Sequence, residues 1–457
     1  VQEFQFGMAW SEYSRFVGDV FGAPLAMEGL LAFFVESTFL GLWIFGWNRL
    51  PKKVHLATLW LAVIGSWISA YFILAANSWM QHPVGIELVD GRPVLTDIWA
   101  VLTNNTVLAA FPHTIAGAIA VAGGFLLGIA WYQLWRRRKD GIDTVDADGR
   151  VIVGEAADIP GRDTADHRVW ITSLRLGAVV AIVGFGAVAI TGDIQGKLMY
   201  EQQPLKMAAA EAACHTGTSF SVLSVGKLGA QDCSEVVPVI EIPGVLSFLA
   251  KGDFTTEMPG LNDLIPQYQE LYGTHLPDSE LYGERAGSEI EYMPNLEVTY
   301  WGFRIMIGFG AIAAFAAAVA LWLTRKGTVP LSKPLMQLAV FGILAPFGAN
   351  AAGWIFTEMG RQPFVVAPNP NPSGVDGVFM FTAAAVSPGV DGWEIVFSLV
   401  SLGLVYLVLM VVEVMLLARF VRAGIAGVMP ERFHDDDDAD GPDGDAGSRD
   451  DVLAFAY

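Results

Sequence analysis

The stretch VTYWGFRIMIGFGAIAAFAAAVALWL, residues 298–323, decides the fold class, because it holds 26 residues and a single charge, that of Arg304. A helix needs about 20 apolar residues to cross the hydrocarbon core of a bilayer. Six further runs meet the same criterion, so the predicted spans are 22–47, 57–79, 104–134, 168–192, 298–323, 336–358 and 392–420. With 53% hydrophobic residues in a chain of 457, the sequence predicts an all-α integral membrane protein with seven transmembrane helices.

Basic residues orient these spans. They gather after the first, third, fifth and seventh spans, in the clusters Arg49/Lys52/Lys53, Arg136/Arg137/Arg138/Lys139, Arg325/Lys326 and Arg419/Arg422. All four clusters fall on one side if the spans alternate, and the positive-inside rule makes that side the cytoplasmic face of the plasma membrane. The predicted parts are then transmembrane helices in 1–192 with an acidic cytoplasmic insert at 140–167, an external segment 193–297, transmembrane helices in 298–420, and an acidic disordered cytoplasmic tail 421–457.

The acidic excess concerns the surface. The chain has 47 acidic and 27 basic residues and a formal net charge of −20. Such an excess suits the surface of a halophile protein and argues against nucleic acid as a partner. An ordinary acidic disordered tail explains residues 434–451 equally well.

Two cysteines, Cys214 and Cys233, lie nineteen residues apart in the external segment. An oxidising outer face would let them pair. We therefore predict a disulfide, with two unrelated thiols as the alternative.

Ionisable residues inside spans are costly and mark functional sites by default. Glu28 and Glu36 are eight residues apart in the first span, which is about two helical turns and about 12 Å. This spacing predicts a ladder of carboxylates on one face; acids satisfied by a neighbouring arginine or a cavity are the alternative. In the second span Ser69 and Asn77 have the same spacing and extend a polar track, or they join neighbouring helices.

An imidazole and a thioether lie at similar depth near the external face. His113 is in the third span and Met306 in the fifth. A haem iron can take this pair as axial ligands, and the thioether favours reduced iron. Arg304, two residues before Met306, could pair with a haem propionate. The alternatives are a hydrogen-bonded packing histidine and a gap-filling methionine.

Glu358 ends the sixth span, and Arg361 follows three residues later. The two side chains can share one helical face. A salt bridge that caps the span at the interface is the alternative to a functional site.

Several collinear stretches between Gln2 and about Pro363 resemble one family. They are QEFQFG, GDVFGAPLAMEGLLAFFVEST, ANSWMQHPVG, FPHT, KMAAAEA, FRIM and GWIFTEMGRQPF. Together they resemble subunit I of the cytochrome bd quinol oxidases. The resemblance implies a subunit that oxidises quinol at the outer face and reduces O2 to water with protons taken from the cytoplasm.

The resemblance also implies the cofactor sites. A low-spin haem b would have His113 and Met306 as axial ligands and Arg304 beside it. A high-spin haem b and a haem d would lie near a group of five residues, of which Glu358 is the haem-ligating carboxylate: Glu28, Glu36, Trp354, Glu358 and Arg361.

The remaining implied roles concern quinol and protons. In KMAAAEA of the external segment, Lys206 and Glu211 would bind quinol. Proton access would use Glu36, Ser37, Ser69 and Asn77. The implied partners are subunit II of cytochrome bd and a small single-span subunit.

One departure from the family pattern stands at the start of the sequence. The family carries a haem-ligating histidine in a first span, and the sequence begins at Val1 without that span. We expect a full-length subunit of nine spans, of which the first and most of the second lie outside this sequence.

Three other functions compete with this one. A cyanide-insensitive relative would carry b haems alone. An ion or solute transporter could use Glu28 and Glu36, but it leaves His113, Met306 and KMAAAEA without a role. A haem–copper oxidase needs several histidines inside spans, whereas His113 is the one clearly inside.

Overall fold

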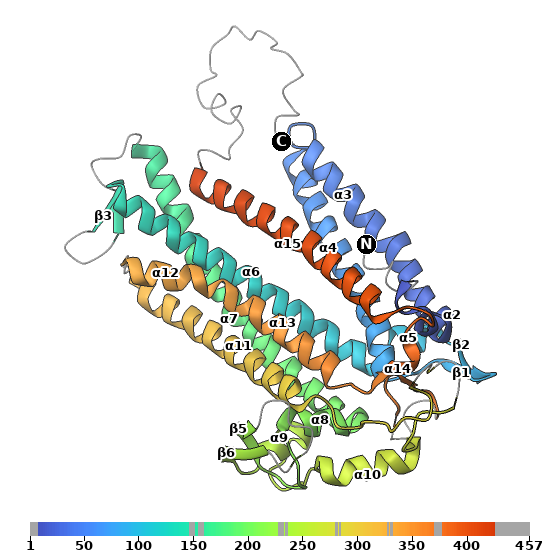
Figure 1. Cartoon of the computed structure of the whole chain (residues 1–457). Helices are drawn as coiled ribbons and strands as arrows, with labels where there is room; N and C mark the ends of the chain where they lie inside the picture. Colours follow the sequence, from blue (N-terminus) through green and yellow to red (C-terminus); the bar gives the residue numbers. More distant parts are fainter. Residues whose placement is uncertain are drawn as a thin grey trace.

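Seven helical segments of the computed structural model are long and apolar enough to cross a membrane, as the sequence predicts. The structure describes residues 8–145, 151–153, 160–226, 233, 236–278, 282, 285–326, 329, 332–369 and 377–425. The seven segments are Ser11–Phe45, Lys52–Gln81, Ile98–Lys139, Ala165–Gln202, Leu296–Thr324, Lys333–Met359 and Gly392–Ala423. Figure 1 shows them running in roughly the same direction along the molecule.

Several of the segments are built from more than one helix. The first joins α2 (Ser11–Met27), the π-helix η1 (Glu28–Phe33) and α3 (Phe34–Phe45). The sixth joins α12 (Lys333–Gly342) and α13 (Leu344–Met359). The other long helices are α4 (Lys52–Gln81), α6 (Asn105–Lys139) after the short α5 (Ile98–Leu102), α7 (Pro160–Gln202), α11 (Leu296–Thr324) and α15 (Gly392–Ala423).

The first span begins earlier than the predicted residue 22. Helix α2 starts at Ser11 and continues through Pro24, which lies inside it. A proline removes a helical N–H donor and usually ends or distorts a helix. Here the chain stays helical and changes to a π-helix from Glu28 to Phe33. Hydropathy finds the apolar part of a helix, so polar turns at its ends remain unpredicted.

Glycines let helices α6 and α7 pack with their backbones in contact. A Cβ atom on Gly123 would lie 2.4 Å from the backbone nitrogen of Ala181, and one on Gly184 would lie 2.7 Å from that of Ala120. A Cβ on Gly177, which like Gly184 belongs to α7, would lie 2.7 Å from the backbone nitrogen of Leu127. Small residues of this kind allow close helix packing in membranes. Helices α11, α12 and α13 pack beside this pair (Figure 1).

The helices α2, η1, α3 and α4 form a second group. A Cβ on Gly65 of α4 would lie 2.8 Å from the backbone nitrogen of Glu36, so the two helices also meet closely at this level. Helix α4 in turn contacts α6 and joins the two groups.

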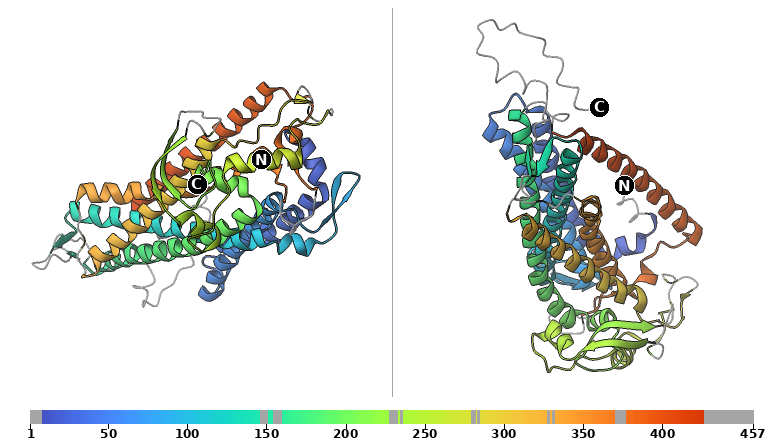
Figure 2. Two further views of the ribbon diagram at one scale, coloured as in Figure 1. Left: turned by 90° about the horizontal axis from the view of Figure 1, so that it is seen from below. Right: turned by 90° about the vertical axis from the view of Figure 1, so that its left-hand side faces the viewer.

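The predicted external segment, residues 193–297, folds at one end of the helices (Figures 1 and 2). It contains α8 (Pro204–Glu211), β5 (Phe220–Gly226), β6 (Val236–Ile242), α9 (Val245–Lys251) and α10 (Leu261–Tyr272). Its buried residues Leu205, Leu261, Tyr268 and Tyr292 form one core with Phe364, which lies after α13. Nearby are β1 (Ile86–Val89), β2 (Arg92–Leu95), β7 (Phe364–Val366), β8 (Met380–Phe381) and α14 (Thr382–Ala385).

The hairpin of β3 (Asp143–Val145) and β4 (Val151–Val153) lies at the opposite end (Figure 1). The described residues thus include four antiparallel two-stranded sheets, all in connections between spans. The sequence analysis did not predict these strand pairs, because their strands are only two to seven residues long and carry weak periodicity. The predicted tail 421–457 lies outside the described residues from residue 426 onward.

Candidate functional site

The two carboxylates of the first span both face helix α4. Glu28 accepts a hydrogen bond from the Ser69 hydroxyl at 2.8 Å. Glu36 accepts one from the Ser66 hydroxyl at 2.9 Å. In a regular α-helix, residues eight apart are offset by about 80° beyond two turns. A π turn contains more residues per turn, so η1 reduces this offset and keeps both acids on one face.

Ser66 lies beside Glu36, and the sequence analysis did not identify it. The Ser37 hydroxyl donates to the backbone oxygen of Phe33 at 2.7 Å, within its own helix. Ser66 lies three residues before Ser69 on α4, and residues three apart share a helix face. That spacing was the signal in the sequence that could have identified Ser66.

The His113 imidazole is held by helix α7. Its Nδ1 lies 3.0 Å from the Thr191 hydroxyl oxygen. The Thr191 hydroxyl donates to the backbone oxygen of Ala187 at 2.7 Å, so its proton is already used and Nδ1–H is the donor to it. The neutral ring then has its lone pair on Nε2, the nitrogen left for a metal ion. A Cβ on Gly192 would lie 3.3 Å from His113 Cε1, so a glycine gives the ring its space.

Met306 is positioned in the same way by helix α13. A Cβ on Gly353 would lie 2.7 Å from its Sδ. Met306 is ten residues from the start of α11 at Leu296, and His113 is eight from the start of α6 at Asn105. The two side chains therefore lie at similar depth on neighbouring helices. An imidazole nitrogen and a thioether sulfur, each given space by a glycine, fit the axial ligand set of a haem iron.

Arg304 has protein partners, in addition to the haem propionate that the sequence suggested. Its Nη2 lies 2.7 Å from Glu211 Oε2. Its Nη1 donates to the backbone oxygen of Ala210 at 3.2 Å, and its Nε to that of Ser221 at 3.1 Å. The guanidinium lies 4.4 Å from the ring centres of both Phe220 and Tyr300. Arg304 therefore fastens the external segment to α11.

Glu211 is buried, with 1% of its surface exposed. Its Oε2 is bound by Arg304, whereas its buried Oε1 has no hydrogen-bond partner among the described residues. Burial raises the pKa of the Glu211 carboxyl to about 7, although the Arg304 charge and hydrogen bond act to lower it. A carboxyl group with this pKa and a free oxygen can accept a proton near neutral pH.

Lys206, five residues earlier on α8, points to a different set of helices. Its Nζ donates to Gln81 Oε1 at 3.2 Å and lies 5.6 Å from the ring centre of Phe356. Burial lowers the pKa of the Lys206 ammonium to about 7. The Arg361 charge lowers this pKa further, and the Glu358 charge raises it. The sequence missed Gln81, which lies one helical turn after Asn77 in ANSWMQHPVG.

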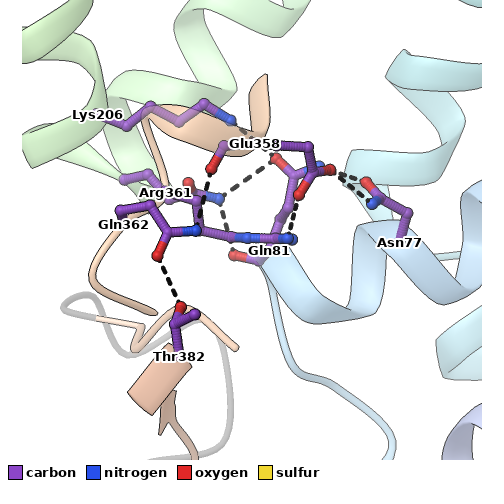
Figure 3. Close-up of polar contacts among 8 residues, drawn as sticks. Asn77, Gln81, Lys206, Glu358, Arg361, Gln362 and Thr382 are labelled. Atoms are coloured by element: carbon purple, nitrogen blue, oxygen red, sulfur yellow. Dashed lines mark hydrogen bonds and ion pairs between the residues drawn. The ribbon is translucent and has the colours of Figure 1, made fainter. Parts of the chain in front are cut away.

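Glu358 and Arg361 form the predicted pair at the end of α13. Glu358 Oε1 also accepts a hydrogen bond from Asn77 Nδ2 at 3.1 Å. Buried Arg361 keeps Nε and Nη1 without a hydrogen-bond partner among the described residues. Two guanidinium nitrogens without a partner, beside a carboxylate, fit a further anionic group such as a haem propionate. Figure 3 shows this cluster, and Trp354 lies one turn before Glu358 on α13 with 48% of its surface exposed.

Cys214 and Cys233 form a disulfide in the structure, with their Cα atoms 5.5 Å apart. The bond joins the end of α8 to the residues before β6. It lies in the same segment as Lys206 and Glu211 and closes a loop there.

Comparisons with known proteins agree with one another. The family model for cytochrome bd terminal oxidase subunit I matches residues 1–425. A cytochrome bd ubiquinol oxidase subunit 1 of Bacillus subtilis (strain 168) is 36% identical over 430 residues, which is 93% of this chain and 80% of the relative. The cytochrome bd-II ubiquinol oxidase subunit 1 of Escherichia coli (strain K12) is 29% identical over 479 residues, covering 94% and 85%. The solved structure of bd oxidase from Geobacillus thermodenitrificans matches with a TM-score of 0.69 and 27% identity, covering 92% of this chain and 82% of that one.

Proposed function

The chain belongs to the cytochrome bd terminal oxidase subunit I family, and from this premise we propose how its residues share the work of a quinol oxidase. It is a multi-pass membrane subunit of a haem-binding oxidoreductase that assembles with a subunit II. When bound, the haems supply electron transfer and the reduction of oxygen. The residues of this chain bind quinol, hold the haems and move protons.

We place quinol oxidation at helix α8. The observation that carries this proposal is the pair of buried ionisable side chains, Lys206 and Glu211, both with a pKa of about 7. The Lys206 ammonium donates a hydrogen bond to one ring oxygen of the quinol. Glu211 Oε1, which lacks a partner among the described residues, accepts the proton of the other hydroxyl. At neutral pH a substantial fraction of Lys206 is then protonated, as a donor must be, and a substantial fraction of Glu211 is deprotonated, as a base must be.

We assign the low-spin haem b to His113 and Met306. The Thr191 hydroxyl fixes the imidazole so that Nε2 is free, and Gly353 leaves room for the thioether. Arg304 lies two residues from Met306 and binds Glu211. The proposed quinol base, Glu211, and the haem ligand Met306 are thereby held by the same short stretch of α11. This arrangement favours a short distance for electron transfer from quinol to the haem.

We assign the high-spin haem b and the haem d to the region of the remaining acids. Glu358 would supply a carboxylate ligand, and the free N–H groups of Arg361 would bind a propionate. The other residues of this region are Glu28, Glu36 and Trp354. Glu28 and Glu36, each hydrogen-bonded to a serine of α4, would hold protons for oxygen reduction.

Protons for water would reach this region from the cytoplasm. The polar side chains on the path are Glu36, Ser37, Ser69 and Asn77, to which the structure adds Ser66. In this orientation the external segment 193–297 faces outward across the plasma membrane, and the tail 421–457 faces the cytoplasm. Protons released by quinol leave on the outer side, and protons consumed in oxygen reduction enter from the cytoplasm. Charge is therefore separated across the membrane without a pumping step. A small single-span subunit would complete the complex.

The test separates quinol oxidation from oxygen reduction. Lys206→Ala and Glu211→Ala in the assembled complex should strongly lower quinol-driven oxygen consumption. All haem bands should persist, and oxygen reduction from an artificial electron donor should survive. Wild-type quinol turnover in both variants would place quinol binding elsewhere in the protein. The same spectra decide the haem set, because absence of a d-type band near the red end would identify a complex with b haems alone.

A further inference from the structure

We propose that Gln81 is a positioning residue for quinol oxidation, which holds the Lys206 ammonium where it meets the quinol ring oxygen. This inference rests on the proposed role of Lys206. The motif reading and the family resemblance gave Gln81 no role. Its side chain nevertheless stands between the quinol lysine and the carboxylate at the end of α13 (Figure 3).

The observation is a chain of three hydrogen bonds across three helices. Lys206 Nζ donates to Gln81 Oε1 at 3.2 Å. Gln81 Nε2 donates to Asn77 Oδ1 at 2.8 Å. Asn77 Nδ2 donates to Glu358 Oε1 at 3.1 Å. All three bonds donate in the same direction, from the ammonium to the carboxylate, so each amide dipole stabilises both charged ends.

The amide of Gln81 has one orientation that satisfies this chain. A flipped amide would turn Nε2 toward the Lys206 ammonium, so two donors would face each other, and Oε1 would face the oxygen of Asn77. The backbone of Gln81 is held as well, because Gln203 Nε2 donates to its carbonyl oxygen at 3.1 Å. Gln203 immediately precedes α8, so the start of the helix that carries Lys206 is tied to the end of α4.

Gln81 Oε1 is the side-chain oxygen that accepts a hydrogen bond from the Lys206 ammonium among the described residues. The Phe356 ring lies 5.6 Å from Nζ. A Cβ on Gly360 would lie 2.9 Å from Lys206 Cγ, so the stem of the lysine is packed closely against α13. The charged groups that face Lys206 are Arg361, which repels the ammonium, and Glu358, which attracts it. The Gln81 oxygen links the ammonium to the attractive charge.

The experiment compares variants of Gln81 in the purified complex with its partner subunit, with a short-chain ubiquinol as substrate. Gln81→Met removes the oxygen at similar volume and should raise the KM for quinol about tenfold, the range expected for losing a hydrogen bond to a charged group. Gln81→Glu keeps an oxygen for Lys206 and should stay within about threefold of wild type. Haem bands and oxygen consumption from an artificial donor should be unchanged in both. Gln133→Met, another buried glutamine at the far end of α6, is the matched control and should leave KM unchanged.

A double variant shows whether Gln81 acts through Lys206. Once Lys206→Met has raised KM, adding Gln81→Met should raise it no further, because the group to be positioned is gone. Multiplicative effects of the two changes, or a wild-type KM in Gln81→Met, would overturn the inference. If the Gln81→Met complex fails to assemble, Gln81→Asn shortens the side chain by one methylene and must show the same rise. Wild-type behaviour of Lys206→Met would refute the proposed quinol site itself, which is a different outcome from failure of Gln81 alone.

Discussion

Arg304 Nη2 lies 2.7 Å from Glu211 Oε2, and this ion pair connects a membrane helix to the external segment. Both side chains are largely shielded from solvent, with 10% and 1% of their surfaces exposed. Removing one partner of such a pair leaves the other charge buried and uncompensated. Glu211 is therefore tied to α11 at a residue that lies two positions before Met306.

His113→Ala and Met306→Ala should each remove the low-spin haem signal while the protein still inserts into the membrane. Each side chain supplies a ligand to iron and contributes little to the hydrophobicity of its span. Reduced-minus-oxidised difference spectra of membranes check this outcome, with exposed His275→Ala as the control. An unchanged low-spin spectrum in both ligand variants would rule out the assignment.

Gly353→Ala should disturb the low-spin haem with little loss of stability. The added Cβ would lie 2.7 Å from Met306 Sδ, and the flexible thioether can move away from it. The expected result is a changed low-spin spectrum or midpoint potential with normal thermal stability. Gly342→Ala adds the same atom where nothing lies within 4 Å and should change neither measurement. Equal spectra in the two variants would show that the thioether is not held at its ligand position by Gly353.

Glu358→Ala should alter a high-spin haem band, because the carboxylate is the proposed ligand. Glu394→Ala removes an acid that caps α15 and serves as a control for a purely structural loss. Loss of that cap should lower only stability, by about 1 kcal/mol. If Glu358→Ala likewise changed thermal stability alone, its pairing with Arg361 would be a salt bridge that caps α13 and no more.

Quinol oxidation should have a bell-shaped pH profile with its maximum near pH 7. Burial raises the pKa of Glu211 to about 7, so its proton-accepting form increases as the pH rises through that value. Burial lowers the pKa of Lys206 to about 7, so its charged donor form is lost as the pH rises through the same value. Lys206→Arg keeps the charge at all these pH values and should remove the alkaline limb.

Glu211→Gln is the complementary change, and it should lower quinol turnover on the order of 10²-fold by removing the base. Oxygen consumption from an artificial donor, measured over the same pH range, is the control for both variants. Identical pH profiles in wild type and Lys206→Arg would show that the alkaline limb comes from another group.

The Cys214–Cys233 bond should stabilise the external segment and carry no electrons in turnover. Peptide mapping without reductant should recover the joined peptides from native membranes, and two free thiols there would contradict the bond. Cys214→Ser/Cys233→Ser should lower the thermal stability of the segment, in line with about 2–4 kcal/mol for closing a loop. The haem bands of the double variant should remain those of the wild type.

Hydropathy predicted the number and order of the spans, because each apolar run exceeds the length a bilayer requires. It could not predict the helix ends or the π turn at Glu28, since both depend on polar turns and on packing against α4. Glu358 and Arg361 lie on one side of the chain at the end of α13, as their three-residue spacing led us to expect, and they form an ion pair. Whether this pair is a functional site or a cap of α13 stays a prediction.

The contacts between segments far apart in the chain could not be predicted from the sequence. Ser66 meets Glu36 where α3 and α4 come into close contact at Gly65, and nothing in the sequence indicated this contact. Arg304 meets Glu211 only because the external segment folds back onto α11, across a sequence separation of 93 residues. Gln81 carries no charge, so it does not stand out among the ionisable residues that mark functional sites within spans.

The glycine contacts between α6 and α7 fix the distance between the two helices. Since backbone meets backbone at Gly123, Gly177 and Gly184, the spacing of the two helices is fixed by atoms that every residue shares. Side chains of α6 and α7 that point away from this contact can therefore change while the distance from Thr191 to His113 stays the same. Sequence change on the rest of these two helices is thus separated from the geometry of His113, the proposed iron ligand.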